Sequence, residues 1–436
     1  MNIRVSRTDS PGPGASLDRW LSWQESLHPR SVDLGLERVR QVAERLGLLP
    51  WPVPTITVAG TNGKGSTVAC IQAGLQASGL RVLAYTSPHL LRYNERIVID
   101  GAPVDDARLV EAFCRIDQAR GHISLTYFEF GTLAALWLGM QAGVDAAVLE
   151  VGLGGRLDAV NVVDARVAVI TRVGLDHTQW LGNDREQIAA EKAGILRPGS
   201  PAVCSDPEPP SAVLERAAAT GAPLWLPGRD FRIQLRGGDW HWQGGGRRLR
   251  LQAGTSPPWH ASNLAGALAA LDRFEQACGL PLDWPALAPV VADAHPPGRL
   301  SRWHGDDRVW LDVGHNPLAL EALQPWLEAH GPVHLVFAAL ADKDLPAMAA
   351  RLAPWVVHWW LAGLEEVARG LSSRQLMQRL GLGGADCSCH PHPGAALQAA
   401  LQVGDDRPVL VCGSFHTVAA VLGERADGNP GSGKSG

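Results

Sequence analysis

The 436-residue chain is long enough for two or three domains, each with its own core. A formal net charge of −5 excludes the strongly basic surface that nucleic-acid binding or a polybasic membrane anchor needs. The seven cysteines are scattered and odd in number, which indicates free thiols in a reducing compartment. Because the first residues also lack the apolar run of a secretory signal, we expect a soluble, cytoplasmic protein.

The first part of the chain alternates helical and strand patterns. Residues 34–49 predict a helix, with Leu36, Val39, Val42, Leu46 and Leu49 on one face. "TITVAG" at 55–60 predicts a buried strand that runs into a glycine loop and then into a helix carrying Val68, Ile71 and Leu75. Further buried strands are predicted at 144–152, 166–174 and 201–206, and helices at 105–119, 129–142 and 184–196. Such alternation favours a mainly parallel sheet covered on both faces.

The most apolar window, residues 133–155, is too polar for a membrane helix. Gln141, Asp145 and Glu150 interrupt it, and hydrocarbon would not solvate these groups. We therefore expect a buried helix followed by a buried strand, and no contact with a membrane.

The pattern changes twice after residue 228. Residues 229–252 alternate polar and apolar side chains and predict a small antiparallel meander. Prolines and a glycine at 294–299 predict a linker, followed by a second series of strands at 308–314, 333–340, 356–363 and 407–414. We expect an N-terminal domain over 1–296, a C-terminal domain over 297–425 and a disordered tail over 426–436. "CSCHPH" at 387–392 is interpreted as a surface loop rather than a metal site, because no second cluster of ligands lies nearby in the sequence.

Two stretches pair a lysine with glycines. "GNPGSGKS" at 428–435 fits the usual phosphate-loop pattern but lacks the strand before it and the helix after it, so we interpret it as a chance match. "GTNGKGST" at 60–67 departs from that pattern, yet it has both flanking elements. Glycines let the backbone wrap an anion there, and the helix N-terminus supplies positive potential. Taken alone, the loop could still be an ordinary glycine turn.

"VAGTNGKGST" resembles the ATP loop of the Mur ligase superfamily. The strings "YTSPHLLRYNERI", "LTYFEFG", "LEVGLGGRLDAVN", "LDHTQWLG", "EKAGILRPG", "LDVGHNP" and "VCGSFHTV" narrow the resemblance to bacterial folylpolyglutamate and dihydrofolate synthases, over about residues 17–423. The resemblance implies an α/β fold: an N-terminal phosphate-loop ATPase domain with a mainly parallel sheet and a meander, and a smaller Rossmann-like C-terminal domain that acts as a glutamate ligase.

The resemblance also implies a reaction. Members join L-glutamate to dihydropteroate or to reduced folates, splitting ATP to ADP and phosphate through an acyl phosphate. Positioning and charge neutralisation are the main needs of such phosphoryl transfer. ATP is expected between the domains, and the residues implied to hold it are Thr61, Asn62, Gly63, Lys64, Gly65, Ser66, Asn263, Arg299, Asp312 and, more weakly, His315. Arg299 is placed on the linker, where it could meet a phosphate on domain closure.

Two Mg²⁺ sites are implied. Ser87 and Glu150 would hold the first, while His177 and Lys192 would belong to the second. In the family the matching lysine carries a carbamate derived from CO2, which makes it a carboxylate-like ligand; without the resemblance Lys192 would be an exposed helix lysine beside Glu191. Lys64, His177 and Lys192 are the implied catalytic residues.

The substrate walls are carried over from the same strings. The pterin would be held by Val32, Asp33, Leu34, Thr126, Tyr127, Phe128, Glu129, Leu157, Asp158 and Ala159, with core packing as the alternative role for Phe128. Ser414 and His416 are the implied neighbours of L-glutamate. Members of the family are usually monomers, so we expect one here.

Several alternatives stay open. The chain could act only as a folylpolyglutamate synthase. A peptidoglycan Mur-type ligase would normally carry an extra N-terminal domain, and only about 50 residues precede the glycine loop here. A phosphate-loop switch would hydrolyse nucleotide without regard to glutamate or pterin and would have no use for Lys192. A non-catalytic relative is disfavoured because the residues matched to the family strings are all present.

Overall fold

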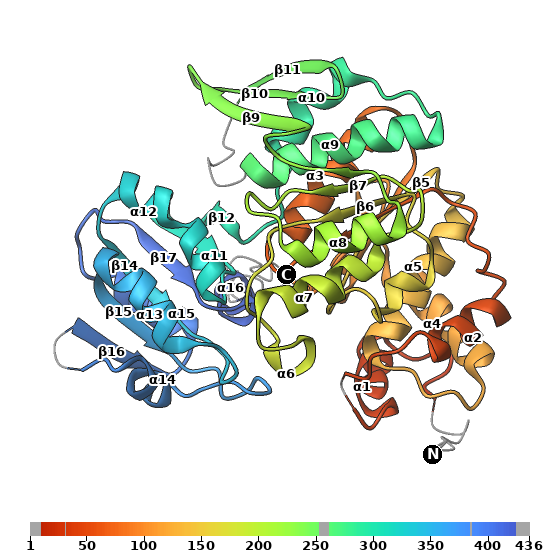
Figure 1. Cartoon of the computed structure of the whole chain (residues 1–436). Coiled ribbons are helices and arrows are strands. Elements are labelled where there is room, and N and C mark those ends of the chain that lie inside the picture. The colour runs from red at the N-terminus through yellow and green to blue at the C-terminus, as the bar shows by residue number, and fades with distance from the viewer. Residues whose placement is uncertain (1–9, 31, 253–260, 384–385, 424–436) are drawn as a thin grey trace, which may run out of the picture. The chain divides into compact units, whose positions relative to one another are not determined.

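A computed structural model describes residues 10–30, 32–252, 261–383 and 386–423. The chain forms two compact units, one of Met1–His89 and Asn94–His295, the other of Leu90–Tyr93 and Pro296–Gly436. Figure 1 shows a sheet with helices on its faces in each unit. The tail stretch 428–435 and the tail predicted to be disordered from 426 lie outside the described residues.

The larger unit is built on an eight-stranded sheet of order β4-β3-β2-β5-β1-β6-β7-β8. Its strands are β1 (Thr55–Ala59), β2 (Val82–Tyr85), β3 (Ile97–Ile99), β4 (Ala102–Pro103), β5 (Ala146–Glu150), β6 (Val167–Ile170), β7 (Ala202–Cys204) and β8 (Leu224–Trp225). The central strands β2, β5, β1, β6 and β7 pair in parallel, while β3 and β4 add an antiparallel edge. Every residue of β1, β5 and β6 is buried, which explains why apolar and β-branched residues dominate these strands.

One face of this sheet packs on α3 (Lys64–Ala77), α9 (Ala261–Cys278) and α10 (Trp284–Asp293). Ile56, Val58, Val148 and Val169 belong to the same core cluster as apolar residues of these helices. A separate three-stranded antiparallel sheet, β9 (Phe231–Arg236), β10 (Asp239–Gly244) and β11 (Arg247–Gln252), joins that cluster and lies beside α9 and α10 (Figure 1). The predicted meander is confirmed.

The other face carries α5 (Tyr127–Ala142) and, packed against it, α4 (Asp106–Arg120). A Cβ on Gly139 of α5 would lie 2.7 Å from Leu83 of β2, so the helix sits directly on the sheet. The remaining elements of the unit are α1 (Leu17–Leu27), α2 (Glu37–Arg45), α6 (Thr178–Leu181), α7 (Arg185–Lys192) and α8 (Ser211–Thr220), with short 3₁₀ turns at Tyr93–Arg96, Ala159–Val162 and Ala193–Ile195.

The smaller unit holds a six-stranded sheet of order β12-β13-β17-β14-β15-β16. Its elements are β12 (Arg299–Arg302), β13 (Val309–Asp312), α11 (Pro317–Ala322), α12 (Gln324–His330), β14 (Val333–Phe337), α13 (Leu345–Leu352), a 3₁₀ turn (Ala353–Trp355), β15 (Val356–Ala362), α14 (Ser373–Leu380), β16 (Cys387–His390), α15 (Pro393–Leu401), β17 (Val409–Cys412) and α16 (Phe415–Gly423). All neighbours pair in parallel except β12, which runs antiparallel to β13. α15 and α16 share an apolar core with the sheet.

The structure confirms the α/β fold and corrects some of its details. The window 133–155 is the end of α5 followed by β5, as predicted. The helix predicted over 34–49 spans only Glu37–Arg45. "CSCH" is strand β16 and not a loop, because its pairing with β15 is a tertiary contact that its polar composition does not reveal. Arg299 begins β12 and does not lie in a linker.

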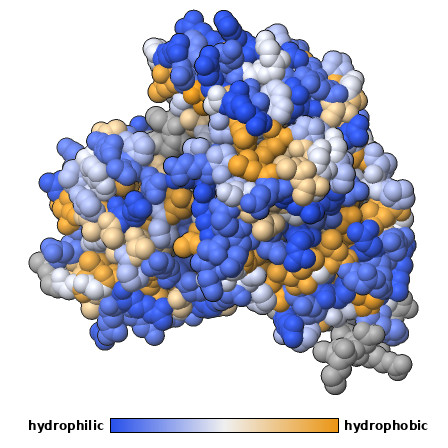
Figure 2. Space-filling view, viewed as in Figure 1, coloured by the Kyte–Doolittle hydropathy of each residue, from blue (hydrophilic) through white to orange (hydrophobic). Residues whose placement is uncertain are grey.

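The face drawn in Figure 2 is largely hydrophilic, with apolar patches between the polar residues. Among the described helices, none combines the length and the apolar character that crossing a bilayer requires.

Candidate active site

The glycine loop 60–67 connects β1 to α3, as a phosphate loop does. Gly63 has a φ of +90° and directly precedes α3, and its backbone conformation is one that side chains with a Cβ rarely adopt. At Gly60 a Cβ would lie 1.7 Å from Thr171 Oγ1, so only glycine fits there. A Cβ on Gly63 would lie 2.2 Å from Asn263 Oδ1, which places the predicted residue Asn263, on α9, against the loop.

The loop is fastened to the segment after β6. Thr61 and Asn62 donate their backbone N–H groups to Arg172 O, at 2.8 and 3.2 Å. The Thr61 hydroxyl also donates to Gly174 O and accepts from Gly174 N, each at 3.0 Å. The start of the phosphate loop and the segment that leads to His177 therefore form one hydrogen-bonded unit.

The loop fits a phosphate. The first turn of α3 has no side-chain cap, so its backbone N–H groups are available to an anion. Lys64 Nζ donates to two loop carbonyls, Gly60 O at 3.2 Å and Thr61 O at 3.3 Å. Asn62 Oδ1 and Thr67 Oγ1 are buried without a hydrogen-bond partner among the described residues. Ser66 and Gly65 lie in the same first turn, with Ser66 buried.

Glu150 and Ser87 lie together beside this turn. Glu150 is buried at the end of β5, and its Oε2 accepts from Ser87 N at 3.2 Å. A Cβ on Gly65 would lie 3.7 Å from the same oxygen. Magnesium usually takes one or two carboxylates plus phosphate oxygens, so this pair suits a metal bound together with a nucleotide. Within the described part of the chain, no group of three or more His, Cys, Asp or Glu is placed to hold a metal by itself.

Lys192 is buried, and is not the exposed helix lysine that its sequence position beside Glu191 suggests. It ends α7, is only 4% exposed, and donates from Nζ to Gly60 O at 2.9 Å, which brings it to the base of the phosphate loop. Burial and, next, the charge of Lys64 lower its pKa from 10.5 to about 7, while Asp176 and Asp158 oppose that shift. A large part of the Lys192 population is therefore a neutral amine near neutral pH.

His177 lies in the same neighbourhood but on the surface. It precedes α6 with a φ of +51°, next to Asp176, whose side chain accepts from His177 N at 2.9 Å. This segment is supported by an ion pair, Asp206 and Arg185, that no sequence pattern indicates. Buried Asp206 accepts from Val173 N at 2.8 Å and from Arg185 Nη2 at 2.9 Å. Arg185 starts α7 and has no local pattern that identifies it as a support.

The three segments predicted to hold the pterin meet in the larger unit. Gly35 N donates to Leu157 O at 3.2 Å, which joins residues 32–34 to 157–159. Asp158 is 2% exposed and accepts from Leu153 N at 2.8 Å and Val160 N at 3.1 Å. Burial raises the pKa of Asp158 to about 7, against these hydrogen bonds and the charge of Lys64. Ala159 begins the 3₁₀ turn that Asp158 caps.

The segment 126–129 begins α5 with a capping box. Thr126 Oγ1 accepts from Glu129 N at 3.2 Å, and Glu129 Oε2 accepts from Thr126 N at 2.7 Å. Phe128 packs on Gly152, where a Cβ would lie 2.6 Å from its ring, and its centroid is 5.7 Å from that of Tyr85. The Arg96 guanidinium lies 5.5 Å from the centroid of Tyr127. The start of α5 is thus an aromatic wall with a buried carboxylate.

In the smaller unit, three residues implied to bind nucleotide lie close together. Arg299 on β12 lies opposite Asp312 on β13 in the antiparallel strand register. Asp312 is buried and accepts from Leu300 N at 2.9 Å and Gly314 N at 2.7 Å, and burial raises its pKa while Arg299 opposes that rise. Phe415, which the sequence analysis did not single out, lies 5.2 Å from the Arg299 guanidinium and 5.9 Å from the His315 ring.

The two residues implied to contact glutamate differ in environment. Ser414 is buried, and its hydroxyl accepts from Thr417 N at 3.0 Å and lies 2.8 Å from Thr417 Oγ1, so it is engaged at the start of α16. His416, two residues further on, is exposed. Of the two, His416 is the side chain that a ligand reaches without breaking a local hydrogen bond.

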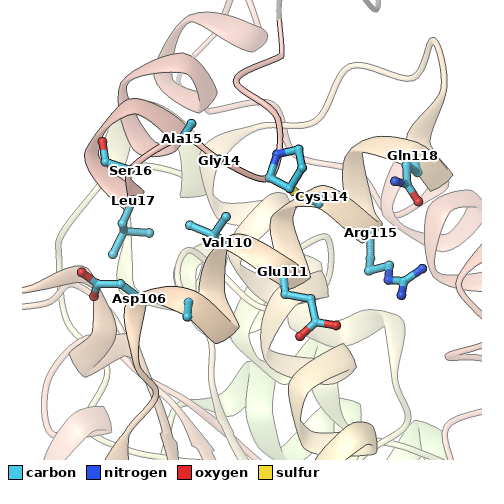
Figure 3. A pocket seen from close by; sticks show the side chains of 12 residues that line it. Gly14, Ala15, Ser16, Leu17, Asp106, Val110, Glu111, Cys114, Arg115 and Gln118 are labelled. Atoms are coloured by element: carbon cyan, nitrogen blue, oxygen red, sulfur yellow. The ribbon is translucent and has the colours of Figure 1, made fainter.

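A hollow of about 610 Å³ lies outside these sites, between the segment that precedes α1 and one face of α4. Figure 3 shows Val110 of α4 beside Leu17, whereas the side chain of Arg115 points away from them. The residues that line it include none of the predicted site residues.

The chain matches two protein families. Residues 58–205 match the Mur ligase middle domain, and residues 298–415 match the family described as "Mur ligase, glutamate ligase domain". The first match contains the phosphate loop, Glu150 and Lys192, and the second contains Arg299 and Asp312.

Curated relatives and solved structures agree with these matches. The dihydrofolate synthase/folylpolyglutamate synthase of Escherichia coli K12 is 44% identical over 425 residues, covering 96% of this chain and 97% of that protein. The structure "E.coli FolC in complex with DHPP and ADP" superposes with a TM-score of 0.89 at 42% identity, covering 96% of this chain and 99% of that chain. A bifunctional synthase from Yersinia pestis "complexed with AMPPNP and Mn ion" gives a TM-score of 0.87 at 43% identity, covering 96% of this chain and 100% of that chain. This chain belongs to the dihydrofolate synthase/folylpolyglutamate synthase family of Mur ligases.

Proposed function

We propose that the chain joins L-glutamate to dihydropteroate, forming dihydrofolate, and to reduced folates, forming folylpolyglutamates. ATP drives both reactions through an acyl phosphate and is released as ADP and phosphate. The observation that carries the proposal is the similarity to the Escherichia coli synthase, which extends over 96% of this chain. The phosphate loop, with the buried residues Glu150, Lys192 and Asp158 in its neighbourhood, supports the same conclusion from the residues themselves.

The phosphate loop would bind the β- and γ-phosphates of ATP. Lys64 and the uncapped N-terminus of α3 would neutralise their charge, and Asn263 would hold the loop in shape from α9. Arg299, Asp312 and His315 would contribute from the smaller unit. We assign residues 1–296 to the ATP- and pterin-binding domain and 297–425 to the glutamate ligase domain.

Two Mg²⁺ ions would bind with the nucleotide, the first on Ser87 and Glu150, the second on His177 and a carbamylated Lys192. Bound magnesium would neutralise the phosphates during transfer. The lowered pKa of Lys192 supports the carbamate, because only a neutral amine combines with CO2. A carbamate would also replace a cation beside Lys64 by an anion, which removes the repulsion that lowers the pKa.

Pterin recognition is assigned to the three segments 32–34, 126–129 and 157–159. Asp158 and Glu129 are acceptors for pterin N–H groups, and Phe128 offers a ring to a flat heterocycle. The structure named for Mn, AMPPNP and L-glutamate, 44% identical to this chain, supports glutamate as the amine substrate, with Ser414 and His416 as its proposed neighbours. All seven cysteines are free thiols, which supports our proposal of a cytoplasmic enzyme, and we propose that it acts as a monomer.

The test is ADP release with ATP and Mg²⁺, in the presence of dihydropteroate, L-glutamate, both or neither. We expect ADP only when both are present, and again when tetrahydrofolate replaces dihydropteroate. ADP release with tetrahydrofolate and L-glutamate, but not with dihydropteroate and L-glutamate, would reduce the function to that of a folylpolyglutamate synthase. ADP formation that ignores all of these substrates would refute the ligase and leave a nucleotide switch. Lys64→Met, which keeps the stem and removes the charge, is the inactive control.

A further inference from the structure

We propose that Arg38 is a positioning residue that sets the shape of the pterin site by holding Asp33 and Glu129 together. The inference rests on the proposed function, because it concerns the segments assigned there to the pterin. Arg38 lies on α2, outside all three segments, and no local sequence pattern singles it out.

Arg38 contacts the first segment through both ends of its guanidinium. Nη1 donates to Asp33 Oδ2 at 2.6 Å, and Nη2 donates to the backbone carbonyl of Asp33 at 2.7 Å. The second contact fixes the main chain of residues 32–34 and not only a side chain. His28 and Arg30 also lie near the Asp33 carboxylate, at 3.4 and 3.6 Å, but neither reaches the backbone.

The same guanidinium reaches the second segment. Nη2 lies 3.1 Å from Glu129 Oε1, on the first turn of α5. Glu129 is 3% exposed, and its Oε1 has no aligned hydrogen-bond partner among the described residues, so this ion pair is what offsets the burial of that oxygen. Burial raises the pKa of Glu129, and the Thr126 N–H and Arg38 oppose that rise. Without Arg38 the carboxylate would be left with its capping contact alone.

The first segment is therefore held at both ends. Arg38 fixes it at Asp33 to α5, and Gly35 N fixes it to Leu157 O of the third segment. One guanidinium thus joins two of the three walls, and the Gly35 hydrogen bond joins the third. A fork of planar donors suits this task, whereas a lysine ammonium can hold only one of these acceptors well.

The experiment compares Arg38→Met and Arg38→Lys with Arg40→Met, an exposed arginine on the same helix. For each variant we would measure the KM for dihydropteroate, the KM for ATP, kcat and the melting temperature. Losing the free energy of one charge-assisted hydrogen bond corresponds to about a tenfold change in a binding constant. We expect the KM for dihydropteroate to rise about tenfold in Arg38→Met and by a similar factor in Arg38→Lys, with the KM for ATP and kcat close to wild type and Arg40→Met unchanged.

The outcomes separate the two proposals. A wild-type chain whose ADP release ignores dihydropteroate would refute the proposed function. A wild type that responds to dihydropteroate, with Arg38 variants whose KM for it is unchanged or whose KM for ATP rises equally, would refute the role of Arg38 alone. If Arg38→Met does not fold, Arg38→Lys decides, because it keeps the positive charge but can hold only one of the acceptors on Asp33 and Glu129 well.

Discussion

Replacing Lys192 by methionine should abolish ligase activity and remove a carbamate from the protein. Burial and Lys64 lower the pKa of Lys192 from 10.5 to about 7, a difference of 10.5 − 7 = 3.5 pH units. At pH 7 about half of such side chains are neutral, against about one in 3,000 for an ordinary lysine. The buried amine should therefore take up CO2 at a pH where surface lysines do not.

The assay uses ¹³C-labelled bicarbonate and NMR detection of the carbamate carbon. The chain has only four lysines, Lys64, Lys192, Lys343 and Lys434, so one new resonance can be assigned by substitution. We expect the resonance in wild type and in Lys343→Met, and its loss in Lys192→Met. Its intensity should rise as the pH passes upward through 7, because deprotonation supplies the reactive amine.

Activity gives the second measurement. Wild-type ADP release should fall when CO2 is removed from the buffer and return when bicarbonate is added, while Lys192→Met should respond to neither treatment. A CO2-depleted wild type that keeps full activity and shows no carbamate resonance at pH 8 would refute the reasoning.

The other predictions concern glycine geometry, a buried carboxyl and a buried arginine. Gly63→Ala should raise the KM for ATP because the new Cβ would clash with Asn263. Gly79 has a similar φ of +82° but open space around it, so Gly79→Ala should leave that KM unchanged. Equal effects of the two substitutions on the KM would contradict the clash. Asp158 has a folded pKa of about 7, above its ordinary 3.8, so its contribution to stability is present below pH 3.8 and is lost as the pH rises through 7. The difference in melting temperature between Asp158→Asn and wild type should therefore shift in favour of the variant from pH 5 to pH 8, and a pH-independent difference would count against this sign. Arg120→Leu should lower the free energy of unfolding by roughly 3–5 kcal/mol in urea titrations, because Asp117, which lies 2.6 Å from the Arg120 guanidinium, would lose its partner charge. A loss under about 1 kcal/mol would contradict a buried ion pair.

Much of the sheet was predictable because parallel strands are buried on both faces. β1, β5 and β6 appear as short runs of apolar and β-branched residues, and glycines or charged residues bound them. β12 and β16 were missed because each is a four-residue edge strand with few apolar residues. Their residues, "RLSR" and "CSCH", have no strand signal of their own.

The candidate site likewise contains residues that the local sequence indicates and residues that depend on contacts distant in the chain. Lys64 and Glu150 sit at a loop and at a strand end, where sequence context indicates their positions. The burial of Lys192 could not be predicted, because it depends on the contact of α7 with the phosphate loop, 132 residues earlier in the chain. Arg38 was missed for a similar reason: its partner Glu129 is distant in sequence and becomes its neighbour only when α2 meets α5.

The edges of the eight-stranded sheet affect how the protein behaves at high concentration. A parallel sheet with exposed end strands would offer unpaired backbone groups to another copy and promote aggregation. Here both end strands, β4 and β8, are two residues long, and β4 ends in Pro103, which has no N–H to donate. The six-stranded sheet instead ends at β16, a four-residue strand with an exposed Cys389. Self-association through strand pairing should therefore begin at the four-residue edge strands β12 and β16 of that sheet rather than at β4 or β8.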